Sequence, residues 1–213
     1  MRTEDLIQSL AGDTQRVSRH AVEQRVAIGL LGGAAVTLAV MLTFSGLRPD
    51  IDQAMHGFTF WMKWTYTATL AVIATAVVLH VARPDAGRAR WIWLLALPLV
   101  AVAALSGHEL MTTPVSGWMP MWLGSSWQQC SLTVFALSLP VFAGLLWSFR
   151  TLAPMHLRAA GAAAGLAAGA MGATVYGLHC PEVSATFVIT WYTLGMAAAS
   201  ALGALVGPRL MRW

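Results

Sequence analysis

Six apolar stretches, each about as long as a membrane span, run through this chain of 213 residues and limit what it can fold into. A helix needs roughly 20 mostly apolar residues to cross a hydrocarbon core about 30 Å thick. Charged residues make up only 10% of the chain, against about 25% in an ordinary soluble domain. The sequence therefore predicts an all-α membrane protein, a bundle of six transmembrane helices. The expected spans are residues 26–47, 58–82, 91–110, 130–149, 159–178 and 185–206.

The spans divide the chain into three parts: a polar segment at 1–25, a helical domain at 26–207 and a short tail at 208–213. The polar segment contains four arginines and four acids before the first apolar run. A secretory signal instead places a brief basic stretch before a short apolar core and a cleavage site. We therefore expect the first apolar run to be retained as a helix.

The basic residues are distributed by loop. Eleven arginines lie in the N-terminal segment, in the loops after the second and fourth spans, and in the tail, whereas the opposite loops hold Arg48 alone. Cytoplasmic loops of membrane proteins are enriched in Lys and Arg. The pattern predicts that both termini are cytoplasmic and that the segments bearing Cys130 and Cys180 face outward. The arginines of the predicted cytoplasmic segments then account for the basic pI of the chain, so no direct binding of nucleic acid is expected.

The N-terminal segment contains one candidate for contact with another protein. Residues 3–11 read as a short helix, with Leu6, Ile7 and Leu10 forming a narrow apolar stripe. Such a stripe suits either the surface of a bilayer or the groove of a cytoplasmic partner. The sequence does not decide between these two interpretations.

The fifth and third spans carry packing signals. Gly161, Gly165 and Gly169 recur every four residues, followed by Gly172, and small residues at this spacing let helices approach closely in lipid. We therefore expect the fifth span to lie inside the bundle. Prolines at 98 and 140 fall within the third and fourth spans and predict kinks there.

The longest outward loop, 111–129, contains three tryptophans, Trp118, Trp122 and Trp127. Tryptophans at this depth are typical of the aromatic belt at a membrane interface. A ligand cage is the competing interpretation.

The outward ends of the spans gather groups that suit a soft metal ion or a redox pair. Thiolates and imidazoles are the ligands that zinc and related metals prefer. The candidates are His56, His108, Glu109, Cys130, His179, Cys180 and Glu182. Neither a CxxC nor an HExxH spacing is present, so the metal hypothesis depends on the predicted topology. No resident cofactor is expected beyond transient binding of zinc or a heavy metal.

Cys130 and Cys180 are the only two cysteines in the chain. In an oxidising compartment they could form a permanent disulfide between the fourth span and the hairpin of the fifth and sixth spans. A thiol-based sensor and a pair of unconnected cysteines are the alternatives, and the sequence leaves all three open.

Lys63, inside the second span, is expected to extend outward to the interface and is assigned no chemistry. Since no charge pair is expected at mid-membrane, transport is disfavoured.

Several motifs resemble one bacterial family. They are MRTEDLI at 1–7 with Leu10 and Ala11, WLGSSW at 122–127 with Cys130, LAP at 152–154, YGLHCPE at 176–182, WYTLG at 191–195 and GPRLMRW at 207–213. Together they resemble the NrsF family of six-span inner-membrane proteins, which are negative regulators of extracytoplasmic-function sigma factors. The resemblance covers nearly the whole chain, and the HCPE segment with an upstream cysteine is its most specific part.

The resemblance implies a regulator and not an enzyme. It implies that the protein holds a cytoplasmic sigma factor inactive at the bacterial inner membrane and releases it under metal or oxidant stress. It also implies that Cys130 and Cys180 take part in the response. The alternative from another class is a membrane thiol-disulfide oxidoreductase, which the presence of only two cysteines, fifty residues apart, disfavours.

Overall fold

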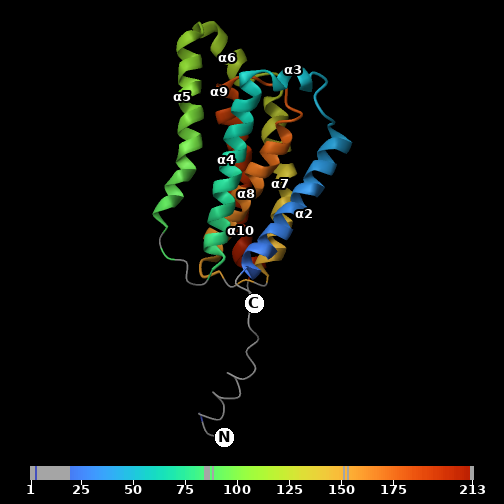
Figure 1. Ribbon diagram of the computed structural model, residues 1–213. Coiled ribbons are helices and arrows are strands. Elements are labelled where there is room, and N and C mark those ends of the chain that lie inside the picture. The colour runs from blue at the N-terminus through green and yellow to red at the C-terminus, as the bar shows by residue number, and fades with distance from the viewer. Residues whose placement is uncertain are drawn as a thin grey trace.

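The computed structural model describes residues 3, 20–83, 87, 89–150, 152 and 154–211, and every regular element within them is helical. Six of the helical stretches are long and apolar enough to cross a membrane. The predicted class of an all-helical protein with six such helices is therefore confirmed. Figure 1 shows the helices side by side in one bundle.

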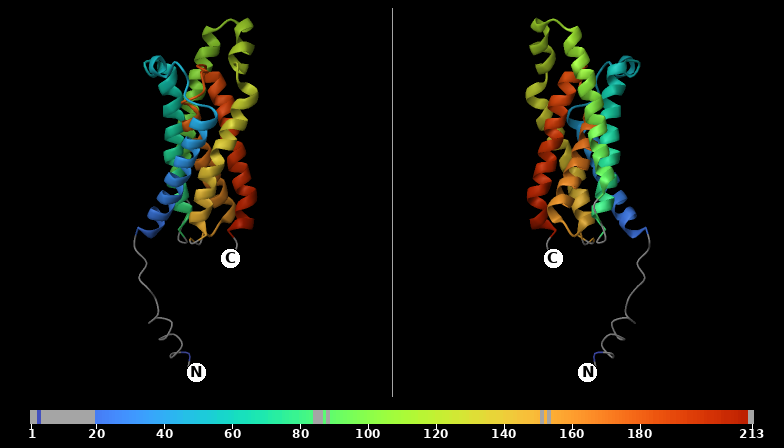
Figure 2. Two further views of the ribbon diagram at one scale, coloured as in Figure 1. Left: turned by 90° about the vertical axis from the view of Figure 1, so that its right-hand side faces the viewer. Right: turned by 90° about the vertical axis from the view of Figure 1, so that its left-hand side faces the viewer.

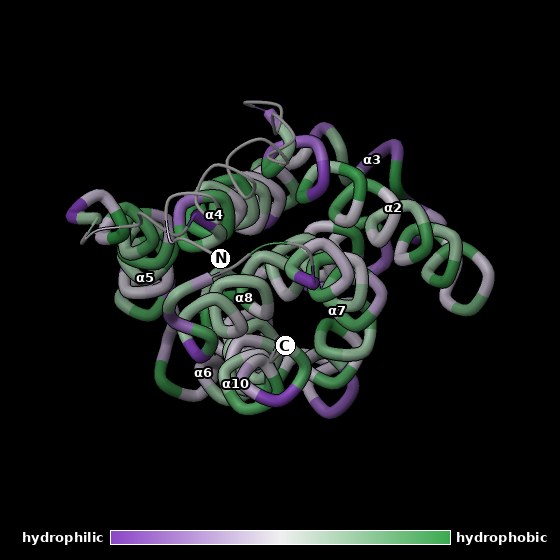
Figure 3. Tube along the Cα trace, turned by 90° about the horizontal axis from the view of Figure 1, so that it is seen from below, coloured by the Kyte–Doolittle hydropathy of each residue, from purple (hydrophilic) through white to green (hydrophobic). Residues whose placement is uncertain are grey.

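The long elements begin and end close to the expected spans. They are α2 (Ala21–Phe44), α4 (Phe58–Val81), η1 (Arg90–Leu95) with α5 (Ala96–Thr112), α7 (Trp127–Phe149), α8 (Leu157–Tyr176) and, in continuous sequence, α9 (Ala185–Phe187), η2 (Val188–Tyr192) and α10 (Thr193–Leu210). Two short helices, α3 (Ile51–Met55) and α6 (Val115–Leu123), lie at the same end of the bundle (Figure 1), on opposite sides of it (Figure 3). The start of α2 and the end of α10 lie at the other end.

Helix α8 occupies the middle of the bundle. Seen along the bundle axis, α4, α7 and α10 surround it (Figure 3), and it packs against all three. A Cβ atom added to Gly161 or Gly165 would collide with the backbone carbonyl oxygen of Gly203 or Ala199 on α10. The glycine spacing thus lets the two backbones touch, and the expectation of an interior fifth span is confirmed.

A second close crossing joins α2 to α7. Gly29 and Gly144 face each other so tightly that a Cβ on either would meet the other's carbonyl oxygen. The hydroxyl of Ser148 also donates a hydrogen bond to the carbonyl oxygen of Arg25 at 2.8 Å. Helix α2 is visibly inclined to its neighbours (Figure 2). It therefore stays attached by this crossing while much of its surface is exposed.

The third span departs from the expected form. Its first part, η1, is a 3-10 helix, and Pro98 lies in the first turn of α5 instead of in the middle of a continuous helix. The prediction of a kink inside the third span was therefore wrong. Proline lacks an N–H group and its ring disfavours the α conformation before it, so it fits the first turn of a helix. Pro140 does lie inside α7.

Large apolar side chains cover the outer surface of the bundle. Phe44 is 86% exposed, Trp93 81%, and Val72 and Leu205 70% each. Soluble monomers rarely expose such continuous apolar area. The surface therefore suits hydrocarbon as its solvent.

Candidate thiol site

Cys130 and Cys180 meet at the end of the bundle that carries α3 and α6. Cys130 lies in the first turn of α7, and Cys180 lies in the turn that follows α8. Both are free thiols with no exposed surface, and a hydrogen bond joins the two side chains. Residues fifty apart in sequence are thus brought to one end of the bundle.

The turn after α8, which we call the HCPE turn (residues 179–182), is attached to the link between α2 and α3. The N–H groups of His179 and Cys180 both donate to the carbonyl oxygen of Tyr176, at 2.9 and 3.0 Å, and end the helix. The N–H of Arg48 donates to the carbonyl oxygen of Leu178 at 3.2 Å. His179 Nδ1 lies 3.0 Å from the carbonyl oxygen of Gly46. Pro181 cannot continue the helix, so the chain turns here.

Lys63 lies against this turn, so it extends toward the end of the bundle predicted to face outward, but it is buried there and does not reach the interface as expected. The side chain is 1% exposed. Its Nζ donates to the carbonyl oxygens of Cys180, at 2.9 Å, and Glu182, at 2.5 Å. A buried ammonium group is costly unless polar atoms replace its hydration. The carbonyl oxygens of the turn supply those atoms, so Lys63 stays buried.

Arg48 is the second cation beside the turn. Its guanidinium binds both carboxylate oxygens of Asp50, Nε to Oδ1 at 2.8 Å and Nη2 to Oδ2 at 2.6 Å, and its Nη1 lies 3.4 Å from the carbonyl oxygen of Cys180. The hydrogen bond from Arg48 lowers the pKa of Asp50, and the same bond raises the pKa of Arg48. Sequence reasoning missed this role. The available signal was that Arg48 is the one arginine in the loops predicted to face outward.

Glu182 connects the turn to the start of α7. Its Oε1 accepts hydrogen bonds from the Ser125 N–H at 2.7 Å, the Ser125 hydroxyl at 2.6 Å and the Ser126 hydroxyl at 3.2 Å. Gly124, with φ +57°, brings the backbone close enough for these bonds. The carboxylate thus holds together the two segments that carry the cysteines.

Two tyrosines complete the surroundings of the thiols. The rings of Tyr176 and Tyr192 lie 5.7 Å apart between centroids, and Tyr192 has no exposed surface. The Tyr192 hydroxyl is buried and makes no hydrogen bond to another described residue, but it is near enough to Cys180 to lower the pKa of that thiol. Tyr192 ends a π-helical turn, a local irregularity that is frequent at functional sites. Neither tyrosine was predicted as a site residue.

The environment favours the ionised form of Cys180. The hydrogen bond from the Cys130 thiol lowers the pKa of Cys180 most, and the Lys63 ammonium and the Tyr192 hydroxyl lower it further, against the opposing effect of burial. Thiolates are the reactive form of cysteine. Cys180 is therefore the better nucleophile of the two candidates.

The other predicted metal ligands are dispersed. His56 Nδ1 lies 2.8 Å from the carbonyl oxygen of Asp52, and His108 is exposed on α5. Glu109 accepts hydrogen bonds from the Ser184 hydroxyl and from the N–H and hydroxyl of Thr186, at 2.8 to 2.9 Å. Among the described residues, no group of three or more His, Cys, Asp or Glu side chains is placed to hold a metal ion. The structure thus brings together only the two thiols.

The loop tryptophans pack against the bundle. Trp122 and Trp127 contact Trp191, with centroid distances of 5.6 and 5.4 Å. Trp191 Nε1 donates to the carbonyl oxygen of Trp122 at 2.8 Å. Trp118 Nε1 donates to the carbonyl oxygens of Leu110, in α5, and Thr113. All three loop tryptophans remain partly exposed, as side chains of an interfacial belt would be.

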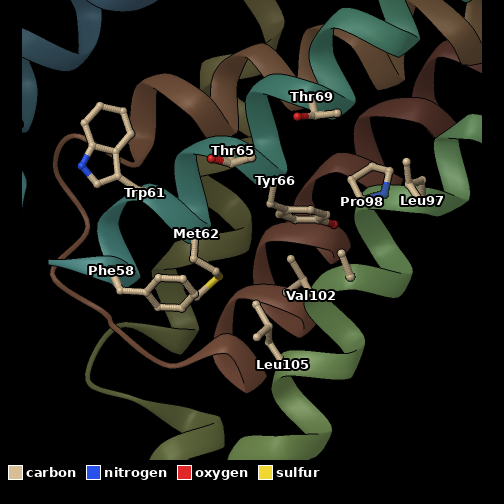
Figure 4. A pocket seen from close by; sticks show the side chains of 11 residues that line it. Phe58, Trp61, Met62, Thr65, Tyr66, Thr69, Leu97, Pro98, Val102 and Leu105 are labelled. Atoms are coloured by element: carbon tan, nitrogen blue, oxygen red, sulfur yellow. The ribbon is translucent and has the colours of Figure 1, made fainter.

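An apolar cavity of about 390 Å³ lies between α4 and α5 (Figure 4). Phe58, Met62, Tyr66 and Val102 are among its lining residues. The Tyr66 hydroxyl is 2.7 Å from Thr193 Oγ1. The lining has no charged side chain, so the cavity suits hydrocarbon.

The predicted partner-binding residues Leu6, Ile7 and Leu10 lie outside the described residues.

The fold and the site together define a class: a helical protein with six span-length apolar helices and a buried thiol pair beside two cations. Comparison with known proteins then identifies the family. The chain belongs to the family described as "Negative regulator of sigma F", whose model matches residues 10–213. The resemblance inferred from the motifs is therefore confirmed.

Two relatives match over the full length of both chains. The chain is 38% identical over 214 residues to the "Probable anti-sigma-F factor NrsF" of Azospira oryzae. It is 39% identical over 216 residues to the "Anti-sigma-F factor NrsF" of Caulobacter vibrioides. No solved structure matches the chain.

Proposed function

We propose that this chain is an integral inner-membrane anti-sigma factor. It holds an extracytoplasmic-function sigma factor inactive and releases it when Cys130 and Cys180 react with an oxidant or a soft metal ion. The observation that carries the proposal is full-length membership of a family whose named relatives are anti-sigma-F factors. The buried thiol pair supplies the chemistry for a stimulus.

The arrangement in the membrane follows from charge and helix count. Among the described residues, the segments at the end of the bundle where α2 starts and α10 ends contain Arg25, Arg83, Arg90, Arg150, Arg158 and Arg209. Cytoplasmic loops carry such an excess, so this end is assigned to the cytoplasm and the thiol end to the outside. An even number of spans places both termini on the same side. The N-terminal segment 1–25, with Leu6, Ile7 and Leu10, is then available to bind sigma inside the cell, and the regulator itself needs no contact with nucleic acid.

The site geometry offers a route for the signal. The HCPE turn is bonded to α4 through Lys63, to the α2–α3 link through Arg48 and to the start of α7 through Glu182. A reaction at the sulfurs therefore alters attachments of elements that reach the other end of the bundle. Regulation requires that sigma and the reacted thiols prefer different states of this bundle.

A reporter strain tests the proposal. Deleting the protein should raise sigma-dependent expression without a stimulus, and Cys130→Ser with Cys180→Ser should abolish induction by oxidant or metal while keeping repression. Unchanged basal expression on deletion would remove the regulatory role. Normal induction in the double-serine variant would remove the thiols from it.

The alternative is a membrane thiol-disulfide oxidoreductase. Such an enzyme passes electrons from one pair of cysteines to a second acceptor, and this chain has two cysteines in all. Both are buried, so a protein dithiol substrate does not reach them directly. Turnover of a dithiol substrate by the purified protein would favour this alternative over the regulator.

A further inference from the structure

Lys63 is bonded to the thiol site although it belongs to a different helix from either cysteine. It projects from the second turn of α4, where it is 1% exposed. Its two acceptors are the backbone carbonyl oxygens of Cys180 and Glu182, the residues on either side of Pro181. These bonds fix the course of the main chain on both sides of the proline.

The turn has few backbone-to-backbone hydrogen bonds of its own, and side chains make most of its attachments, Arg48 and Glu182 among them. Pro181 has no N–H group, and within the described part of the chain no backbone-to-backbone hydrogen bond is made by Pro181, Glu182 or Val183. The next such bond along the chain runs from the Val188 N–H to the carbonyl oxygen of Ser184. The segment between the end of α8 and the start of α9 therefore depends on side chains for its position, and Lys63 provides two of the bonds.

The position of this segment determines whether the two sulfurs can react with each other. A disulfide requires an S–S distance of about 2.05 Å and a narrow range of Cβ separations. The Cys130 side chain is fixed by the start of α7, where its N–H donates to the carbonyl oxygen of Ser126 at 2.9 Å. The Cys180 N–H donates to the carbonyl oxygen of Tyr176 at 3.0 Å, but the chain that follows Cys180 is held by side-chain bonds, so its position depends on them.

We propose that Lys63 is a positioning residue that holds the HCPE turn so that the Cys180 thiol faces Cys130 and is shielded from solvent. The inference rests on the proposed function in one respect, that the thiol pair is the sensor. Lys63 then sets how readily the pair closes when an oxidant arrives.

The experiment measures the two reactions of the thiols separately in isolated membranes containing the full-length protein. The first reaction is closure with diamide, in which both thiols lose a proton and an electron, an S–S bond forms, and the N=N bond is reduced to a hydrazine. The second is alkylation of Cys180 by N-ethylmaleimide, quantified on the peptide by mass spectrometry. Loss of positioning changes the two rates in opposite directions. If the HCPE turn is released, the disulfide forms more slowly, but the Cys180 thiol is more exposed and is alkylated faster.

In Lys63→Met we expect closure to slow by at least about tenfold, since small misplacements of reacting groups have effects of this size. Alkylation of Cys180 should become faster in the same variant. Lys63→Arg keeps a cation and its donors, and it should close within about threefold of the wild-type rate. If Lys63 acted only through its charge on the thiolate, Lys63→Met would slow both reactions, and the proposal would be overturned.

Thr67→Val is the matched control. Thr67 is equally buried one turn along α4, but within the described part of the chain its hydroxyl bonds only to α4 carbonyl oxygens, those of Lys63 at 3.1 Å and Trp64 at 3.4 Å. Thr67→Val should leave the rates of disulfide closure and of Cys180 alkylation unchanged. Equal slowing in Thr67→Val and Lys63→Met, or wild-type closure in Lys63→Met, would contradict the assignment. Because no sigma factor is present, these outcomes are independent of whether the protein is an anti-sigma factor.

Discussion

The carboxylate of Glu182 accepts two hydrogen bonds from Ser125, one from the backbone N–H at 2.7 Å and one from the hydroxyl at 2.6 Å. The two residues are 57 positions apart in sequence, and each lies within five residues of one cysteine. The contact therefore fastens the Cys130 segment to the Cys180 segment without involving either sulfur.

We expect Glu182→Ala to lower the free energy of unfolding by about 1–3 kcal/mol, because it leaves the donors of Ser125 without their carboxylate. Ser125→Ala removes only the hydroxyl and should cost less. The measurement is thermal unfolding in detergent of both single variants and of the double variant. Strict additivity of the two effects would show that the side chains do not interact.

The crossing of α8 and α10 should not tolerate a methyl group. Gly161→Ala places a Cβ against the carbonyl oxygen of Gly203, and overpacking of this kind costs about 1–3 kcal/mol. Gly32→Ala on α2 is the control, since a Cβ there meets nothing within 4 Å. The melting temperature in detergent should fall for Gly161→Ala alone, and equal melting temperatures would contradict the close crossing.

Two glycines with positive φ differ in their surroundings. Gly46 has φ +71°, and Gly124, with φ +57° and ψ −162°, lies in a region almost confined to glycine, where another residue costs about 1–3 kcal/mol. A Cβ on Gly46 meets open space, whereas one on Gly124 would lie 2.6 Å from Glu182 Oε2. Gly124→Ala should therefore destabilise the protein more than Gly46→Ala in the same unfolding assay. A smaller effect at Gly124 would mean that the α6–α7 connection relaxes freely.

The pH dependence of Cys180 alkylation reports on its neighbour. Because the Cys130 thiol donates a hydrogen bond to it, the pKa of Cys180 is lowered. A larger fraction is then thiolate at neutral pH than for a free cysteine, whose pKa is about 8.5. The alkylation rate should rise over a lower pH range than for free cysteine, and Cys130→Ala should move the rise to higher pH. Rates normalised to their alkaline plateau remove the effect of access, and an unmoved profile in Cys130→Ala would argue against the bond.

Two predictions made from the sequence differ from the structure, those for the Lys63 side chain and for Pro98. Lys63 was expected to reach for the interface because an isolated helix in lipid offers its ammonium nothing else. The folded bundle offers the carbonyl oxygens of the HCPE turn, which come from 117 and 119 residues further along the chain. Pro98 was expected to kink a continuous helix, but the preceding segment forms a 3-10 helix and leaves Pro98 in a first turn.

The sequence by itself determined the helical class, the six span-length segments, the interior position of α8 and the family. Apolar length, small-residue spacing and local motifs are properties of residues that are close together in the sequence. They can therefore be identified without the tertiary structure. Only the tertiary structure decided that Lys63 and Arg48 converge on Cys180, that Glu182 binds Ser125, and that Tyr192 lies near the thiols. Those contacts depend on how six helices rotate about their own axes, which close packing of the whole bundle fixes and no single segment encodes.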